Sequence, residues 1–333
     1  MRHVNDTATT RRRCLGITCL SMASLMGIPC AAQALEWPDK PVKIIIPFSA
    51  GGATDSLGRA LALELGKRWK QSVIVDNRPG AGGALGAEVA AKSPPDGHTL
   101  LLASGSMFTV NPFIYQKLPY SIDSFEMITK VASGPMVITV NAALPVKSLK
   151  ELIAWAKNHP GVLHFVSAGN GSQVHMAGES FADAAGIEMI HVPYKGEGPA
   201  YSDLMAGICE VAVANINTMV PLLKGDRLRA LAVTSHERSV LLPNIPTAAE
   251  AGLPGFDFIS WFGLMAPAGT AQSLRHRIYE DLRSALDQPG LKRYFQDLGM
   301  TPVLSEPGTL AQDIAREQAH WKTLIAKRGI HVK

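Results

Sequence analysis

A glycine-containing turn between a predicted strand and a predicted helix is the first feature that could bind a ligand. The apolar run 42–46 leads into Pro47-Phe48-Ser49-Ala50-Gly51-Gly52-Ala53-Thr54-Asp55, which loses its large side chains at the two glycines. A helix that begins directly after such a turn offers bare backbone N–H groups at its positive end. The turn therefore predicts a site for an anion such as a phosphate or a carboxylate. A tight turn whose glycines serve only close packing is the alternative.

A second turn of similar composition lies in the middle of the chain. The predicted strand 163–166 runs into Ser167-Ala168-Gly169-Asn170-Gly171-Ser172, and a helix is predicted over 172–185. Ligands of open α/β folds bind outside the carboxyl ends of parallel strands, which is where turns of this kind lie. We therefore expect the two turns to face each other, each holding one end of a small anion.

Other polar residues near these turns allow more than one role. His175 and Glu179 form an i,i+4 pair that could bind a metal, but no third ligand is spaced nearby and no metal is expected. Tyr194-Lys195-Gly196 ends a predicted strand, and Lys195 could either face the ligand or extend into solvent.

The elements that must position these residues alternate between strand and helix. Strands are expected at 42–46, 73–76, 99–103, 136–140, 163–166, 189–192, 211–213, 228–233 and 259–265. Helices are expected at 57–69, 84–92, 149–159, 172–185, 199–205, 271–286 and 310–327. This alternation predicts an α/β fold with parallel sheets covered on both faces.

Two segments with turn residues, near 131–135 and 255–260, could join two lobes. If the chain crosses at both, residues 35–135 and 259–333 form a discontinuous first lobe and residues 136–258 form the second. Two lobes joined by a hinge, with a cleft between them, are typical of proteins that close on a ligand.

The first 34 residues have the pattern of a secretory signal peptide. Arg11-Arg12-Arg13 precedes an apolar run over 14–29, and Ala32-Gln33-Ala34 forms a small-residue cleavage site. We expect cleavage after Ala34 and export to the periplasm. The arginines also approximate a twin-arginine signal, so the Sec and twin-arginine routes both remain open.

The composition of the remaining chain excludes several classes of partner. Residues 1–34 contain four arginines and one aspartate, so 28 basic and 27 acidic side chains remain, a net charge of +1. Neither nucleic acid nor a lipid surface is expected as a partner. Cys209 is the single cysteine left, which excludes an intramolecular disulfide, and we expect it to be buried and inert.

Several motifs together resemble one family. Besides the two glycine turns, the chain contains Asn77-Arg78-Pro79-Gly80-Ala81-Gly82-Gly83, Pro193-Tyr194-Lys195-Gly196, the runs 228–234 and 246–252, and Gly263-Leu264-Met265-Ala266-Pro267-Ala268-Gly269-Thr270. In this order, over essentially the whole exported chain, they resemble the Bug-type periplasmic solute-binding receptors of tripartite tricarboxylate transporters.

The resemblance implies a type 2 periplasmic binding protein fold and a small organic carboxylate as ligand. It implies a monomeric, non-enzymatic receptor without a cofactor, which delivers its ligand to the membrane subunits of a transporter. The carboxylate would be held by backbone N–H groups, small hydroxyls and bridging waters, because arginine or lysine clamps are not the family's main device. Such water-bridged contacts can be nearly as good as direct ones.

The resemblance also marks individual positions. The expected ligand-binding residues are Phe48, Gly51, Gly52, Ala53, Asp55, Ser104, Ser106, Asn111, Ser167, Gly169, Asn170, Gly171, Ser172, His175, Tyr194, Lys195, Ala214 and Asn215. Asp55 is expected to cap the helix start or orient water, with solvent exposure as the alternative. For the residues after strand 99–103, turn chemistry alone is the alternative.

One position departs from the family pattern. Many members have an acidic residue where this chain has Ala214, and a carboxylate there would suit an ammonium group on an amino-acid ligand. Its absence favours a plain organic acid or an aromatic acid, although another position could supply the charge.

Three other functions were compared with this one. A dinucleotide-dependent enzyme is disfavoured because the run from Gly80 to Gly86 has the spacing GxGxxxG and strand 99–103 ends without an acidic residue. A hydrolase is disfavoured because the chain has no GxSxG motif. A periplasmic sensor that reports its ligand to a signalling partner stays open, since its lobes would look the same.

Overall fold

The computed structural model describes residues 37–332, and the predicted signal peptide lies outside the described residues. The strands are β1 (Val42–Ile46), β2 (Val73–Asn77), β3 (Thr99–Ser104), β4 (Phe125–Asn141), β5 (His164–Ser167), β6 (Ile190–Pro193), β7 (Val211–Asn215), β8 (Leu228–Val233), β9 (Ile259–Pro267) and β10 (Thr301–Pro302). The helices are α1 (Ala53–Trp69), α2 (Ala84–Ala91), α3 (Ser106–Thr109), α4 (Asn111–Ile114), α5 (Leu149–Asn158), α6 (Gln173–Ala185), α7 (Glu197–Ala206), α8 (Ile216–Met219), α9 (Gln272–Leu286), α10 (Pro289–Asp297) and α11 (Pro307–Arg328). Each predicted strand and helix is present, and the short elements α3, α4, α8 and β10 and the nine-residue α10 were not predicted.

The sheet is mixed, with the strand order β2-β1-β3-β9-β4-β7-β5-β6. The pairs β1–β2, β1–β3, β5–β6 and β5–β7 are parallel, as predicted. The prediction is wrong for β4 and β9, which run antiparallel to each other and to their other neighbours. The error has a physical cause: a strand buried on both faces has the same apolar pattern in either direction.

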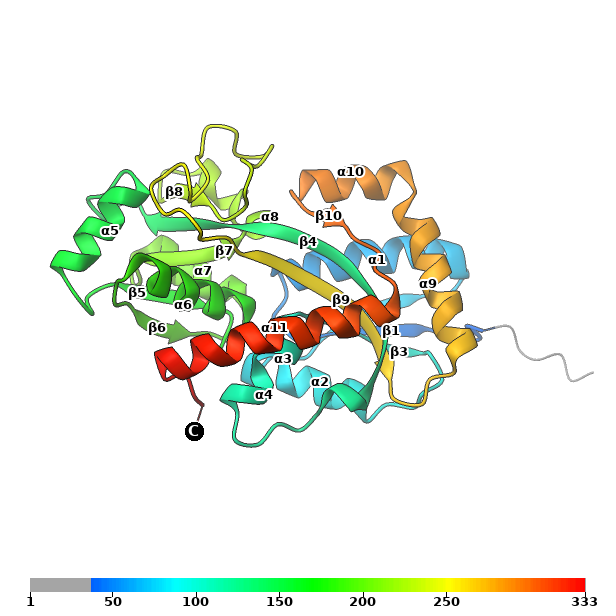
Figure 1. Cartoon of the computed structure of the whole chain (residues 1–333). Helices are drawn as coiled ribbons and strands as arrows, with labels where there is room; N and C mark the ends of the chain where they lie inside the picture. The colour runs from blue at the N-terminus through cyan, green and yellow to red at the C-terminus, as the bar shows by residue number, and fades with distance from the viewer. Residues whose placement is uncertain (1–36, 333) are drawn as a thin grey trace, which may run out of the picture. The chain divides into compact units, whose positions relative to one another are not determined.

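Strands β4 and β9 connect two groups of strands (Figure 1). Residues Phe125–Pro135 of β4 pair with β9, whereas Met136–Asn141 pair with β7 and β8. The segment 131–135, predicted as a turn, is therefore extended backbone within one 17-residue strand. The hydroxyl of Ser260 donates to the carbonyl of Gly134, which ties the two strands where the predicted turn was placed.

We call β1, β2, β3 and β9 the first strand group and β5, β6, β7 and β8 the second strand group. Helix α11 packs against both groups. Its residues Leu310 and Ile314 belong to a buried cluster with Ile45 of β1, whereas Trp321 and Leu324 belong to a cluster with β4, β5 and β7. Figure 1 shows this helix lying across β4 and β9. The C-terminal helix thus links the two groups.

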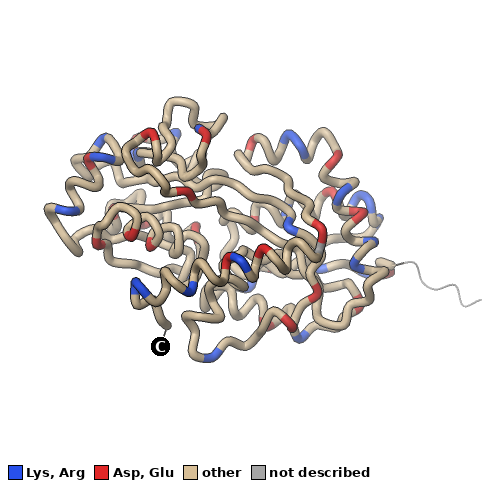
Figure 2. Tube along the Cα trace, viewed as in Figure 1, with Lys and Arg blue, Asp and Glu red and all other residues tan. Residues whose placement is uncertain are grey.

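Charged residues are distributed over both strand groups, with basic and acidic side chains interspersed (Figure 2). Many of them form ion pairs with each other, such as Arg68 with Asp281 and Lys130 with Asp313. Within residues 37–332 no helix is long and apolar enough to span a membrane.

Candidate functional site

The first glycine turn leaves the N-terminus of α1 without a side-chain cap. Gly51 has φ +82°, a conformation that favours glycine, and Gly52 caps the helix in an extended conformation without a side-chain acceptor. The N–H of Ala53 donates instead to Oε2 of Glu197, at 3.2 Å. The N–H of Thr54, by contrast, has no hydrogen-bond acceptor among the described residues.

Asp55 stabilises the conformation of the first glycine turn and does not line the cavity described below. Its buried carboxylate accepts hydrogen bonds from the N–H of Gly51 (3.0 Å), from Nδ2 of Asn77 (3.0 Å) and from Nε of Arg59 (2.9 Å). Burial raises the pKa of this carboxyl, but the hydrogen bonds outweigh it and leave the pKa below its usual value. An ionised Asp55 therefore holds the turn together through the N–H of Gly51, the residue before the N-cap of α1.

The second glycine turn is supported by a pair of neutral histidines. The hydroxyl of Ser172 caps α6 by accepting from the N–H of His175 (3.2 Å), and Nδ1 of His175 accepts from the N–H of Gly171 (3.0 Å). His175 stacks on His191 with ring centroids 3.8 Å apart. Burial lowers the pKa of His175 well below its usual value and that of His191 to about 4. Both rings are therefore uncharged near pH 7.

Both turns contribute to one buried cavity of about 10 Å³, which we call the inner cavity. It is lined by Phe48, Gly52, Ala53, Thr54, Ser104, Ala168, Ser172, Gln173, Val174, Glu197, Asn215 and Phe262. The first helical residues of α1 and α6 both lie in this lining, so two positive helix ends converge on one point. Like Thr54 in α1, Gln173 and Val174 of α6 have N–H groups without an acceptor among the described residues. The lining thus combines free N–H donors, the hydroxyls of Ser104 and Ser172, and two phenylalanine rings.

Glu197 is the functional candidate that the sequence analysis missed. It is the first residue of α7, and its side chain enters the inner cavity from the second strand group. Oε1 accepts from Nδ2 of Asn215 at 2.6 Å, in addition to the contact of Oε2 with Ala53. Complete burial raises the pKa of this carboxyl. No lysine, arginine or histidine of the described residues forms an ion pair with it.

Glu197 thus places a carboxylate next to Asn215, the neighbour of Ala214. Ala214 is fully buried in the core beside Asn215, the residue that binds the Glu197 carboxylate. A sequence signal was present, since Glu197 directly follows Tyr194-Lys195-Gly196 at the predicted end of a strand.

A wider cavity of about 470 Å³, which we call the outer cavity, adjoins the inner one at Ala168. Its lining is Gly80, Ala81, Gly82, Tyr115, Ala168, Gly169, Asn170, Pro193, Tyr194, Lys195 and Pro199. The hydroxyl of Tyr194 donates to Asp203 at 2.6 Å, which holds the ring in place. Lys195 is exposed and forms no ion pair with any described residue.

Two glycines allow close approach between segments of the two strand groups. A Cβ atom on Gly82 would overlap the carbonyl oxygen of Asn170, and one on Gly196 would overlap the hydroxyl of Ser49. Gly82 also has φ +58°, and Gly196 has φ +154°. No larger residue fits at either position while these segments are in contact.

The expected binding residues thus fall into three sets. Phe48, Gly52, Ala53, Ser104, Ser172 and Asn215 line the inner cavity. Gly169, Asn170, Tyr194 and Lys195 line the outer cavity. Gly51, Asp55, Ser106, Asn111, Ser167, Gly171, His175 and Ala214 line neither cavity.

Several of the residues that line neither cavity hydrogen-bond to the backbone of the glycine turns. Nδ2 of Asn111 donates to the carbonyl of Gly82 (3.1 Å), and the hydroxyl of Ser167 accepts from the N–H of Gly169 (3.0 Å). His175 and Glu179 approach within 3.8 Å. No group of three metal-binding side chains occurs among residues 37–332.

The whole chain is similar to known proteins. The family model described as "Tripartite tricarboxylate transporter family receptor" matches residues 57–330. The chain belongs to this receptor family. BugT of Bordetella pertussis is 35% identical over 309 residues, covering 92% of this chain and 95% of BugT.

Two solved structures of similar proteins contain carboxylates. The chain matches an R. palustris protein with adipate at a TM-score of 0.85 and 32% identity, covering 89% of this chain and 99% of that one. It matches MatC from Rhodopseudomonas palustris, with bound malate, at 0.81 and 30% identity, covering 86% and 99%. The family and these neighbours are periplasmic solute-binding proteins and not enzymes, so the enzyme alternatives are not supported. Within the run 80–86, Ala81–Gly83 form a short turn, Ala84 begins α2, and Gly80, Ala81 and Gly82 line the outer cavity.

Proposed function

We propose that this receptor captures a small organic carboxylate between two lobes and delivers it to the membrane subunits of a tripartite tricarboxylate-type transporter. It would act as a periplasmic monomer after cleavage of the signal peptide at Ala34. The observation that carries the proposal is the convergence of two helix N-termini on one buried cavity. The adipate and malate held by two related proteins support a carboxylate as the ligand class.

In this proposal, residues 37–135 and 259–332 form one lobe and residues 136–258 form the other. The inner cavity offers about 10 Å³ to the centre of a water-sized sphere, which is room for about one water molecule and not for a carboxylate ligand. A carboxylate therefore enters only when the walls separate, which a change of backbone angles near the 135/136 and 258/259 junctions would allow. Gly82 and Gly196 permit the contacts that close the cleft again.

The proposed binding chemistry uses neutral donors. The N–H groups of Thr54, Gln173 and Val174 point their dipoles at one carboxylate, and the hydroxyls of Ser104 and Ser172 complete its hydrogen bonds. An affinity in the micromolar range, about −8 kcal/mol, is expected for such a site.

A thermal-shift screen of mono-, di- and tricarboxylates, amino acids and nucleotides tests the ligand class. A ligand at a hundredfold excess over its Kd stabilises the folded state by about 2.7 kcal/mol, so modest binders are visible. We expect shifts with carboxylates alone. Stabilisation by nucleotides, or turnover of any compound, would contradict the proposal.

The substitution Gly52→Val tests the position of the site. A Cβ atom at Gly52 would lie 3.6 Å from the carbonyl oxygen of Ser49 and 3.7 Å from Cβ of Glu197, so the valine methyls would enter the inner cavity. Gly225→Val is the matched control, because Gly225 (φ −95°, ψ 170°) shares the backbone conformation of Gly52 (φ −83°, ψ 175°) but is exposed. Both variants should fold, and only Gly52→Val should lose carboxylate binding. Normal binding by Gly52→Val would remove the first turn from the site.

A further inference from the structure

Three hydrogen-bond acceptors lie together at the inner cavity. Two are the carboxylate oxygens of Glu197, and the third is Oδ1 of Asn215. Oδ1 is buried and has no hydrogen-bond partner, because the amide of Asn215 uses its Nδ2 group to donate to Glu197. A ligand that brings only carboxylates would supply no donor for these atoms.

We propose that Glu197 is a specificity-determining residue that binds, together with Oδ1 of Asn215, an ammonium group of the ligand. The preferred ligand is accordingly a 2-amino carboxylate. This inference rests on the proposed function, because it assigns the ligand carboxylate to the helix N-termini of the same cavity.

The charge balance of the cavity carries this inference. The groups that hydrogen-bond to Glu197 are the amide of Asn215, the backbone N–H of Ala53 and the hydroxyl of Thr218, and all three are neutral. A buried carboxylate without a counter-ion is costly, and a cation brought by the ligand would remove that cost. The free N–H groups of Thr54 and Val174 are available to the carboxylate on the neighbouring carbon atom of the same ligand. A plain dicarboxylate would instead place like charges side by side in a medium of low dielectric constant.

A purely structural role for Glu197 makes a different prediction. The contact with Ala53 neutralises part of the positive end of α1, as a capping carboxylate would. If that were its whole task, Glu197→Gln would change stability and would shift the affinity for all ligands equally. Ligand preference is therefore the measurement that separates the two roles.

The experiment is calorimetric titration of the whole exported protein with three matched pairs that differ only by the 2-amino group. These are aspartate and succinate, glutamate and glutarate, and phenylalanine and 3-phenylpropionate. In at least one pair we expect the amino acid to bind at least tenfold more tightly than its partner. Glu197→Gln should reduce that ratio at least tenfold by weakening amino-acid binding. Glu317→Gln is the control, since it removes a half-buried carboxylate that lines neither cavity, and should leave the ratio unchanged.

Two results would overturn the inference while the proposed function stands. One is tighter binding of the acid without an amino group in every pair that binds. The other is an equal change for both members of a pair in Glu197→Gln. If no carboxylate of any kind binds, here or in the thermal-shift screen, the proposed function itself fails.

Discussion

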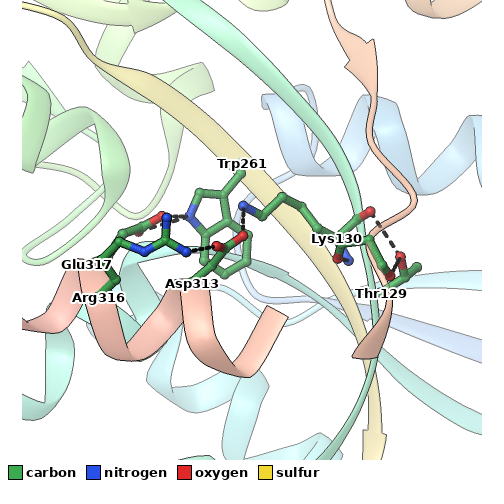
Figure 3. A network of polar contacts seen from close by, with 7 residues as sticks. Thr129, Lys130, Trp261, Asp313, Arg316 and Glu317 are labelled. Atoms are coloured by element: carbon green, nitrogen blue, oxygen red, sulfur yellow. Dashed lines mark hydrogen bonds and ion pairs between the residues drawn. The ribbon is translucent and has the colours of Figure 1, made fainter. Parts of the chain in front are cut away.

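Two carboxylates near β9, the half-buried Glu317 and the buried Glu197, differ in how their charge is balanced. Glu317 on α11 accepts from the indole N–H of Trp261 with both oxygens, at 2.8 and 2.9 Å (Figure 3). Lys130 lies 5.1 Å from the centre of the same indole ring and donates to Asp313 at 2.8 Å. Arg316 donates to the same aspartate at 2.6 Å. Glu197 has only neutral hydrogen-bonding partners and no cation among the described residues.

This difference in charge compensation distinguishes the structural network around Glu317 from the proposed binding site at Glu197. Burial raises the pKa of both carboxyls. At Glu317 the Trp261 hydrogen bond and the charge of Lys130 oppose that rise, whereas at Glu197 only neutral hydrogen bonds do. The first charge is thus compensated within the protein, and in our proposal the ligand supplies the counter-ion of the second. The two sites are also connected, because the backbone N–H of Trp261 donates to Oε1 of Gln173, which lines the inner cavity.

Removing the indole should have the largest effect. Trp261→Ala leaves a large void between β9 and α11 and leaves the half-buried Glu317 without its donor, so we expect a loss of about 3–5 kcal/mol in the free energy of unfolding. Urea denaturation measures this, with the partly exposed Phe113→Ala as control. A loss under about 1 kcal/mol would show that the network around Trp261 and Glu317 does not stabilise the fold.

Acid should lower the free energy of unfolding through the stacked pair His175 and His191, which supports the second glycine turn. The pKa of His191 falls from 6.5 to about 4 on folding, so its contribution is complete above pH 6.5 and is lost as the pH falls through 4. A shift of this size corresponds to about 3 kcal/mol. Urea denaturation between pH 7 and pH 4 measures it. His191→Gln should flatten the profile, whereas His236→Gln, at an exposed site, should not. Identical profiles for the two variants would contradict the assignment.

The proposed closure of the two lobes depends on Gly82, which takes no part in the network around Glu317. Gly82→Ala should weaken carboxylate binding at least tenfold, because its Cβ overlaps the carbonyl of Asn170 when the segments meet. Gly186→Ala is the control. Gly186 has nearly the same backbone angles (φ 60°, ψ 46°, against φ 58°, ψ 29°), and a Cβ atom there would have no neighbour within 4 Å. Both should lose about 1 kcal/mol of stability, from the left-handed conformation alone. Equal affinities in titration calorimetry would argue against closure at Gly82.

The smallest expected effect is on stability, where the isosteric substitutions Glu197→Gln and Glu317→Gln should act in opposite directions. At pH 8 and without ligand, Glu197→Gln should stabilise the fold by about 1 kcal/mol, because it removes an uncompensated buried charge and Asn215 can turn to offer Oδ1 to the new amide. This gain should shrink as the pH falls, since a carboxyl with a raised pKa penalises the folded state only when it is ionised. Glu317→Gln should destabilise by about 1 kcal/mol. Thermal unfolding at pH 8 and pH 5 tests both substitutions. If both stabilise or both destabilise the fold at pH 8, the two carboxylates do not differ in charge compensation.

The sequence was sufficient to predict local features but not long-range contacts. Both glycine turns and their strands were predicted because apolar runs and glycines act within a few residues. The continuity of β4 through Ser133 and Gly134 was missed, because it depends on pairing with β9, more than a hundred residues away. Glu197 was missed for the same reason. Its role follows from contacts with Ala53 and Asn215, and the 197–53 contact joins positions 144 apart in sequence.

Native mass spectrometry of residues 35–333, purified from an exporting host and then supplied with the carboxylates of the screen, tests the central claim most directly. We predict one bound small carboxylic acid per wild-type chain and per Gly225→Val chain, and none per Gly52→Val chain. The account would be contradicted if the wild type bound no carboxylate or carried a compound without a carboxyl group. Retention of the same acid by Gly52→Val would contradict it equally.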